Sequence, residues 1–299
     1  MTRRELLKAG AFLAVPLRIQ KPVAPVRFAV ITDIHHGLAP DSLIRMEAFV
    51  NEVNRRKGLD FVLQMGDFCH SNSASETSPF LEIWNQIDLP KRHVMGNHDM
   101  DRGTKEQVMA LWGMPKRYGA FHVGGYRFIY LDLNHFRKAG KLHSYAYGNY
   151  FTDNATHNLA DPSQLAWLER ELSASDEPTF ILSHQPLGFG SKDQPLPSEQ
   201  VEILDILKRN GRVVGCMSGH LHVNRLEAYS GIPCLSVNSA SYFWQSGMHP
   251  YKDPLFAFFS IDQDGVLRVE GRESSFLKQK PKNDTIGCSA SISDRRVWL

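Results

Sequence analysis

The stretch FAVITDIHHG, residues 28–37, changes from an apolar strand to metal-binding residue types within a few positions. The mostly apolar run over residues 26–32, with Arg27 near its start, is typical of a buried strand, as in a parallel sheet. It ends at Asp33, and His35 and His36 follow. One acid at one strand end carries little information, so the interpretation depends on whether the arrangement recurs further along the chain.

The same arrangement recurs at later points of the chain. Short apolar runs end in Asp, Asn or His at DFVLQMGD (60–67), KRHVMGNHD (91–99), PTFILSHQP (178–186) and RVVGCMSGHLH (212–222). The polar residues at these ends are Asp67, Asn97, His98, Asp99, His184, His220 and His222. Because ligands of α/β sheets bind beyond the carboxyl ends of the strands, we expect these side chains to converge at one rim.

Helical patterns alternate with these runs and indicate an α/β fold. Helices are predicted over residues 41–57, 80–87, 162–173 and 198–210. Alternating strands and helices imply right-handed βαβ units and a parallel sheet. Strand-like segments at 223–229, 234–238, 255–261 and 266–271 predict an antiparallel second half. Residues 118–133 have the pattern of a hairpin, whereas residues 134–161 have no regular pattern.

The residue types at the strand ends favour a particular metal chemistry. Imidazoles with carboxylate oxygens and no thiolate suit Mn, Fe, Zn or Co. One carboxylate can bridge two such ions, and two ions about 3.5–4 Å apart can clamp a phosphoryl group and generate a hydroxide for in-line attack. Glycines stand directly before Asp67, Asn97 and His220, where they suit sharp turns and close backbone approach.

In this order, D-x-H, G-D, G-N-H-D, an isolated strand-end His and G-H-x-H resemble the motifs of the calcineurin-like metallophosphoesterase superfamily. The resemblance covers residues 26–271. The segment QLAWLERELS and the sequence after GHLH are also similar to the branch that contains class III cyclic-nucleotide phosphodiesterases. The resemblance implies a four-layer αββα sandwich, with two mixed β-sheets flanked by helices.

The resemblance also implies a role for each strand-end residue. The first of two divalent metal ions would be bound by Asp33, His35, Asp67 and His222. The second would be bound by Asp67, Asn97, His184 and His220. Asp67 would bridge the two ions, and a metal-bridging hydroxide would be the nucleophile. His98 would approach the phosphate, with Asp99 orienting its imidazole. His70 stands where purple acid phosphatases carry a tyrosine ligand.

We therefore expect a metal-dependent phosphoric ester hydrolase of a small-molecule substrate, and specifically a phosphodiesterase. A phosphomonoesterase or nucleotidase with the same centre is the alternative. A non-catalytic binding scaffold on this fold is disfavoured because no ligand position is lost. His36, His70 and the aromatic residues Tyr145, Tyr150 and His157 either reach the cleft or pack locally, and residues 238–244 are expected near the rim.

Composition limits the alternatives further. With 42% hydrophobic and 22% charged residues, the chain is not of a disordered class, and a net charge of +2 gives no nucleic-acid-binding signature. Beyond the N-terminus, no apolar run has the length of a transmembrane helix. Four cysteines without a CxxC pair argue against a zinc ribbon. Buried thiols are expected, and a Cys216–Cys234 bridge stays open, as does the oligomeric state.

The N-terminus has the pattern of a targeting signal. Arg3 and Arg4 precede a short apolar stretch, and TRRELLK resembles a twin-arginine signal. We expect residues 1–25 to be this signal segment, residues 26–272 the catalytic domain and residues 273–299 a loosely held polar tail. Docking of residues 297–299 stays open. The protein would then be exported, periplasmic or extracytoplasmic, by the twin-arginine machinery.

Export is tested with a reporter fused to residues 1–30. The twin-arginine pattern predicts that the reporter leaves the cytoplasm and that replacing both Arg3 and Arg4 by lysine retains it. A reporter that stays cytoplasmic behind the native segment would remove the argument for export.

Overall fold

The structure is a computed structural model that describes residues 25–71, 73–189, 198–281 and 287–299. Residues 1–24 of the predicted signal segment lie outside these ranges. No helix within them is both long and apolar enough to cross a membrane.

The first sheet contains the N-terminal strand at its centre. Its order is β19-β16-β15-β1-β2-β3, in which β1, β2 and β3 are parallel and the other pairs are antiparallel. The strands are β1 (Val26–Ile31), β2 (Phe61–Gln64), β3 (Lys91–His93), β15 (Ala257–Ile261), β16 (Val266–Glu270) and β19 (Arg295–Trp298).

The second sheet has the order β11-β12-β10-β9-β5-β4. Its four inner strands are parallel, and one antiparallel strand flanks them on each edge. The strands are β4 (Gly119–Val123), β5 (Tyr126–Leu131), β9 (Thr179–Ser183), β10 (Val213–Ser218), β11 (Arg225–Tyr229) and β12 (Ile232–Ser236).

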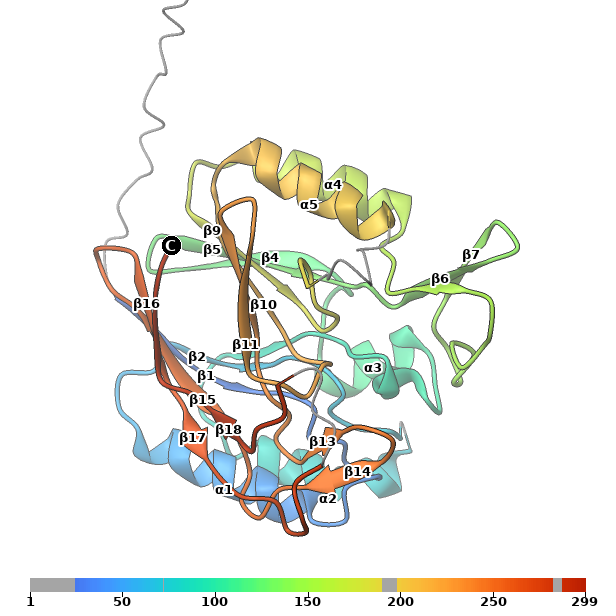
Figure 1. Cartoon of the computed structure of the whole chain (residues 1–299), viewed down its shortest axis with the longest axis vertical. Helices are drawn as coiled ribbons and strands as arrows, with labels where there is room; N and C mark the ends of the chain where they lie inside the picture. Colours follow the sequence, from blue (N-terminus) through green and yellow to red (C-terminus); the bar gives the residue numbers. More distant parts are fainter. Residues whose placement is uncertain (1–24, 72, 190–197, 282–286) are drawn as a thin grey trace, which may run out of the picture.

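Helices cover the outer faces of the two sheets (Figure 1). On the side of the first sheet lie α1 (Ser42–Arg55) and α2 (Ala74–Trp84), and on the side of the second lie α4 (Pro162–Ser173) and α5 (Ser198–Asn210). The predicted four-layer αββα sandwich of two mixed sheets is therefore confirmed.

The alternation of β1 explains why its sequence is apolar from Phe28 to Ile31. Phe28 and Val30 enter the core between the two sheets, whereas Ala29 and Ile31 pack into the core beneath α1 and α2. Each of these side chains is fully buried. A strand with two buried faces has no position for a polar residue until it ends, which is why Asp33 marks the rim so sharply.

Some elements differ from the sequence predictions. Helix α2 starts earlier than residue 80 and accommodates Pro79. Residues 134–161 contain a small sheet, and α3 (Lys105–Trp112) was not predicted, although Thr104 and Gln107 form a complete capping box. The small strands are β6 (His135–Lys138), β7 (Lys141–Ser144), β8 (Thr156–His157), β13 (Tyr242–Trp244), β14 (Met248–Pro250), β17 (Arg272–Glu273) and β18 (Ser291–Ile292).

The segment predicted as a loosely held tail is partly ordered into sheets. β19 pairs with β16 along its length, with Val297 opposite Leu267. Val297 is buried, and its packing against the inter-sheet core together with the ladder hydrogen bonds holds the strand in place. The chain therefore docks at Val297, as the sequence left open for residues 297–299, and the strand starts earlier, at Arg295. Cys69, Cys216 and Cys234 are buried free thiols, as expected from their apolar surroundings, and Cys288 is buried as well.

Candidate metal centre

The rim of the sandwich brings together residues from both sheets. Asp33 and Asp67 follow β1 and β2, and His184 follows β9 of the second sheet. The amide of His220, beyond β10, donates to Asp33 Oδ2 at 3.0 Å. His184 Nδ1 lies 2.8 Å from the carbonyl oxygen of Met65, between the two sheets. The strand ends therefore converge where the sequence predicted.

A first group of ligand-type atoms is formed by Asp33, His35 and His222, which lie within 4.8 Å of one another. His222 Nε2 lies 3.2 Å from Asp33 Oδ1. It also lies 3.1 Å from His35 Nε2. All three residues are buried. Their nitrogen and oxygen atoms thus point at a common centre from different loops.

A second group lies beside the first and consists of Asp67, His184 and His220. His184 Nε2 lies 3.1 Å from Asp67 Oδ2. The same Asp67 oxygen lies 3.8 Å from His35 Nε2 of the first group. Asp67 therefore stands between the two groups, which is the position that a bridging carboxylate requires.

The donor atoms fit divalent cations. His184 Nε2 and Asn97 Oδ1 are buried and have no hydrogen-bond partner among the described residues. His222 Nδ1 lies 2.8 Å from the carbonyl of Tyr242, so this nitrogen carries the proton and Nε2 presents a lone pair. Lone pairs of buried imidazoles and carboxylates that face one another repel unless a cation lies between them. Mixed nitrogen and oxygen donors of this kind suit the predicted metals.

The pKa shifts of the site residues also favour bound cations. Burial would raise the pKa of Asp33, but His184 and His222 lower it to about 2. Burial lowers the pKa of His184, but Asp67 and Asp33 raise it to about 9. Burial and the neighbouring His184 lower the pKa of His220 to about 4. The carboxylates are ionised, and a divalent cation competes with the imidazole proton, because only neutral imidazole is a ligand.

The backbone around these side chains is strained. Five of the predicted ligand residues have φ between 50° and 67°, in the left-handed region that non-glycine residues rarely adopt: Asp33, His35, Asp67, His220 and His222. Such conformations cost on the order of 1 kcal/mol each and persist where the surrounding structure fixes them. They turn each chain segment sharply at the strand end, so that its side chain points into the rim.

Two of the predicted glycines are needed because the chain approaches itself closely. A Cβ on Gly96 would lie 2.2 Å from the backbone nitrogen and from Oδ1 of Asp67. A Cβ on Gly219 would lie 2.2 Å from Thr32 Oγ1 and 2.5 Å from Asp33 Oδ2. Any side chain at either position would displace a carboxylate of the site.

Asp99 has a different environment from the predicted one. Its carboxylate accepts hydrogen bonds from the amides of Phe68 at 2.7 Å and Gly96 at 2.7 Å, and from those of Asp67 and Cys69 at 3.1 Å. It therefore holds the loop that carries Asp67. The orientation of His98 by Asp99 is corrected: the carboxylate within hydrogen-bond distance of His98 is Asp101, whose Oδ2 lies 3.0 Å from His98 Nδ1.

Asp101 belongs to a network that sequence reasoning missed. His70 Nδ1 lies 2.7 Å from Asp101 Oδ2, and His70 Nε2 lies 2.7 Å from His35 Nδ1. The Tyr150 hydroxyl donates to Asp101 Oδ1. One carboxylate thus contacts His98 directly and reaches the ligand-type residue His35 through His70. The G-N-H-D-x-D spacing was the available signal for Asp101.

The remaining predicted residues divide between the rim and local packing. Residues 134–161 reach the rim through Tyr150, while Tyr145 stacks behind it with ring centroids 4.5 Å apart. Tyr242 lies against His35 and His222, with ring centroids 5.0 and 4.7 Å away. His36 packs on Phe80 and contacts Ser42, away from the two groups. His157 contacts the carbonyl of Tyr150.

Comparison with known proteins agrees with this geometry. Residues 26–224 match the profile of the calcineurin-like phosphoesterases. The chain belongs to the calcineurin-like phosphoesterase family. It is therefore a metal-dependent phosphoester hydrolase with a dinuclear centre, and the scaffold alternative is not needed.

Individual proteins are also similar to this phosphoesterase. It is 25% identical over 257 residues to a manganese-dependent ADP-ribose/CDP-alcohol diphosphatase of Arabidopsis thaliana, covering 71% of this chain and 82% of the relative. A Xenopus tropicalis protein of the same name is 40% identical over 68 residues, which is 21% of this chain and 20% of that protein. A dimetal phosphatase from Danio rerio has a similar fold, with TM-score 0.63, 16% identity and coverage of 86% of this chain and 99% of the other.

The close approach at Gly219 predicts the effect of one added methyl group. Gly219→Ala should push the Asp33 carboxylate out of place, lower the bound metal measured by elemental analysis, and cost about 1–3 kcal/mol in urea unfolding. Gly113→Ala is the matched control, because φ is +65° there and nothing lies within 4 Å of the added Cβ. It should cost about 1 kcal/mol and leave the metal content unchanged. Full metal content in Gly219→Ala would contradict the geometric argument.

Proposed function

We propose that this phosphoesterase cleaves a phosphate with two substituents, in a phosphodiesterase-type reaction, and that its substrates are nucleoside diphosphates linked to a further group. The observation that carries the reaction type is the pair of adjacent ligand groups, with Asp67 of the second group 3.8 Å from His35 of the first and His98 at their edge. The names of the two diphosphatase relatives support the substrate class.

In this proposal each group holds one divalent ion. The first ion would be held by Asp33, His35, Asp67 and His222, and the second by Asp67, Asn97, His184 and His220. The bound ions would supply positive charge that polarises the phosphoryl oxygens and lowers the pKa of water. Water adds to phosphorus and releases a proton to solvent, while the bond from phosphorus to the leaving oxygen breaks and that oxygen gains a proton.

His98 is positioned to deliver this proton. Its backbone amide donates to Asp67 Oδ1 at 2.8 Å, which ties it to the bridging position. Its Nδ1 contacts Asp101, which leaves Nε2 to face the substrate. Burial lowers the pKa of His98, but Asp67 and Asp101 outweigh it and raise the pKa above its usual value. A cationic imidazole both stabilises negative charge on the phosphate and protonates the leaving group.

Exposed aromatic side chains near the rim suit a substrate with a planar base. Phe151 is 69% exposed, and its ring centroid lies 5.9 Å from that of His98. Trp244 is 55% exposed and lies 6.4 Å from Tyr242, which itself packs on His35 and His222. Large exposed aromatic residues commonly serve as contact surfaces for ligands. We assign Phe151 and Trp244 to the base of the substrate.

A substrate panel tests the proposed reaction. The Mn²⁺-loaded protein should hydrolyse ADP-ribose and bis-(p-nitrophenyl) phosphate faster than p-nitrophenyl phosphate, and EDTA should abolish each activity. Asp67→Ala should lose both metals and lower kcat/KM at least about a hundredfold. The loss of a ligand shared by two ions should cost more than the loss of a residue that only orients a ligand, which costs about 10–100-fold. Preference for the monoester would favour the phosphomonoesterase alternative instead.

Asp101→Asn separates the orienting role of Asp101 from metal binding. Loss of the charge behind His98 should lower kcat by about 10–100-fold with KM little changed. Asp176→Asn is the control, since this side chain is 69% exposed and pairs with Arg212 on the surface. Elemental analysis should find full metal content in both variants. An Asp101→Asn enzyme with native kcat would show that His98 needs no carboxylate partner.

A further inference from the structure

A second cavity lies at the edge of the sandwich where both sheets end. β3 is the edge strand of the first sheet and β4 that of the second, so no further strand closes the space between them. The end of α3 and the residues after it cover the opening. The cavity has a volume of about 540 Å³, which is within the usual range of small-molecule sites. It shares no residue with the groups of the metal centre.

The charged side chains that line this cavity are cationic. Within the described part of the chain, the lining contains the cations Lys91 and Arg92 and no carboxylate. Burial together with Lys91 and Arg92 lowers the pKa of His93 to about 3, so its imidazole is neutral and the local potential is positive. The Arg92 guanidinium lies over the Phe121 ring, 4.6 Å from its centroid. An anion is the charge that this environment favours.

Four buried hydrogen-bonding atoms belong to residues that line the cavity. Trp84 and Trp112, only 2% and 9% exposed, both line it. Their indole Nε1 atoms, with Arg92 Nε and His93 Nδ1, are buried and have no hydrogen-bond partner in the described ranges. Three of these four atoms are donors in every state of the side chain. Buried donors without partners are rare in native proteins and require an explanation.

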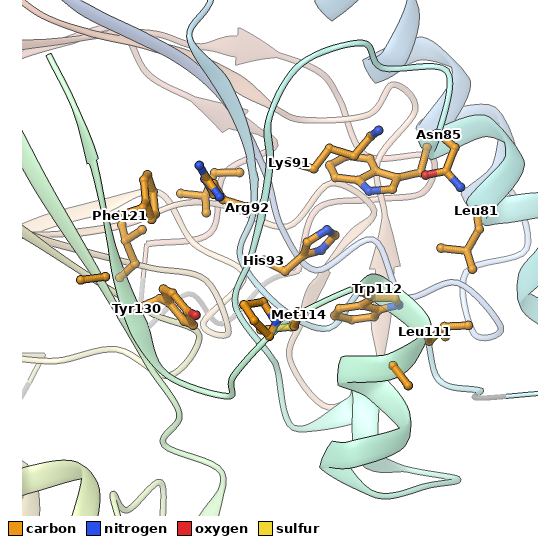
Figure 2. Close-up of a pocket in the computed structure, with 17 residues that line it drawn as sticks. Leu81, Asn85, Lys91, Arg92, His93, Leu111, Trp112, Met114, Phe121 and Tyr130 are labelled. Atoms are coloured by element: carbon orange, nitrogen blue, oxygen red, sulfur yellow. The ribbon is translucent and has the colours of Figure 1, made fainter. Parts of the chain in front are cut away.

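The walls are aromatic and apolar. Figure 2 shows His93 near the middle, with Arg92, Phe121 and Tyr130 on one side and Leu81, Leu111 and Trp112 on the other. The His93 and Trp112 rings are tilted by 31° with centroids 5.4 Å apart. Planar groups of this kind pack well against another ring.

We propose that this cavity is a binding site for a small aromatic anion, distinct from the metal centre. The ring of the ligand would pack among Trp84, Trp112 and Phe121. Its sulfonate or carboxylate group would lie against the cationic groups of Lys91 and Arg92. Such a ligand matches the aromatic walls and the positive charge together, which neither a neutral hydrocarbon nor a cation does.

A matched pair of dyes tests the proposal on the full chain. 8-Anilinonaphthalene-1-sulfonate should bind saturably to one site, measured by energy transfer from tryptophan. Uncharged N-phenyl-1-naphthylamine should bind at least about tenfold more weakly, because it lacks the group that accepts charged hydrogen bonds. Equal binding of the two dyes, or no saturable binding of the sulfonate, would overturn the anion site.

Variants locate the dye. Arg92→Met and Trp112→Phe should each raise the Kd of the sulfonate dye by about tenfold, while thermal melting confirms that both are folded. The matched controls are Arg209→Met, at a different hollow beside α4 and α5, and Trp167→Phe, which packs on Tyr118. Both should bind the dye like the native chain. Native affinity in Arg92→Met and Trp112→Phe would place the dye elsewhere and refute the proposal.

Metal loading separates this site from the catalytic one. EDTA-treated and Mn²⁺-loaded protein should bind the sulfonate dye with the same Kd, whether or not the proposed substrates are hydrolysed. A Kd that depends on Mn²⁺ would place the anion at the metal centre and overturn the proposal of a separate site.

Discussion

The contact between the carboxyl ends of β1 and β10 is the constraint on which the centre depends. There the Asp33 carboxylate of the first sheet accepts the amide of His220 from the second. Because the ligand residues are divided between two sheets, their distances are set by how the sheets stack. The phenylalanine-rich core between the sheets, with Phe28, Phe61 and Phe128 in mutual ring contact, therefore fixes the spacing of the metal ligands.

Local backbone geometry completes what sheet packing begins. The left-handed residues at the strand ends turn the side chains inward, and Gly96 and Gly219 leave room for the carboxylates. Carbonyl contacts such as that of His222 Nδ1 with Tyr242 then fix which imidazole nitrogen faces the centre. The contacts of the fold itself thus orient the side chains toward the centre.

The convergence of the ligand residues follows from local patterns in the sequence, whereas the four layers were implied by the resemblance to the family. An apolar run that ends in Asp67 or His184 shows where a strand ends. Ligands of α/β sheets bind beyond the carboxyl ends of the strands, which places these residues at one rim. Tertiary contacts had no such signal. Asp101 contacts His98 and His70 because the short turn after β3 folds back. Asp99 is nearer to His98 in the sequence, and we therefore expected Asp99 to orient His98. The start of β19 could not be predicted, because Arg295 and Arg296 give no apolar strand pattern and lie at the edge of a sheet.

The central position of β1 has a consequence for how the chain acquires its structure. β1 pairs on one side with β2, a short distance along the chain, and on the other with β15, where Val26 lies opposite Ile261. During synthesis this apolar strand therefore keeps an unpaired edge until nearly the whole chain has left the ribosome. Such an edge is open to pairing with other chains. The dinuclear centre is thus completed late, when the C-terminal strands cover the strand that supplies Asp33.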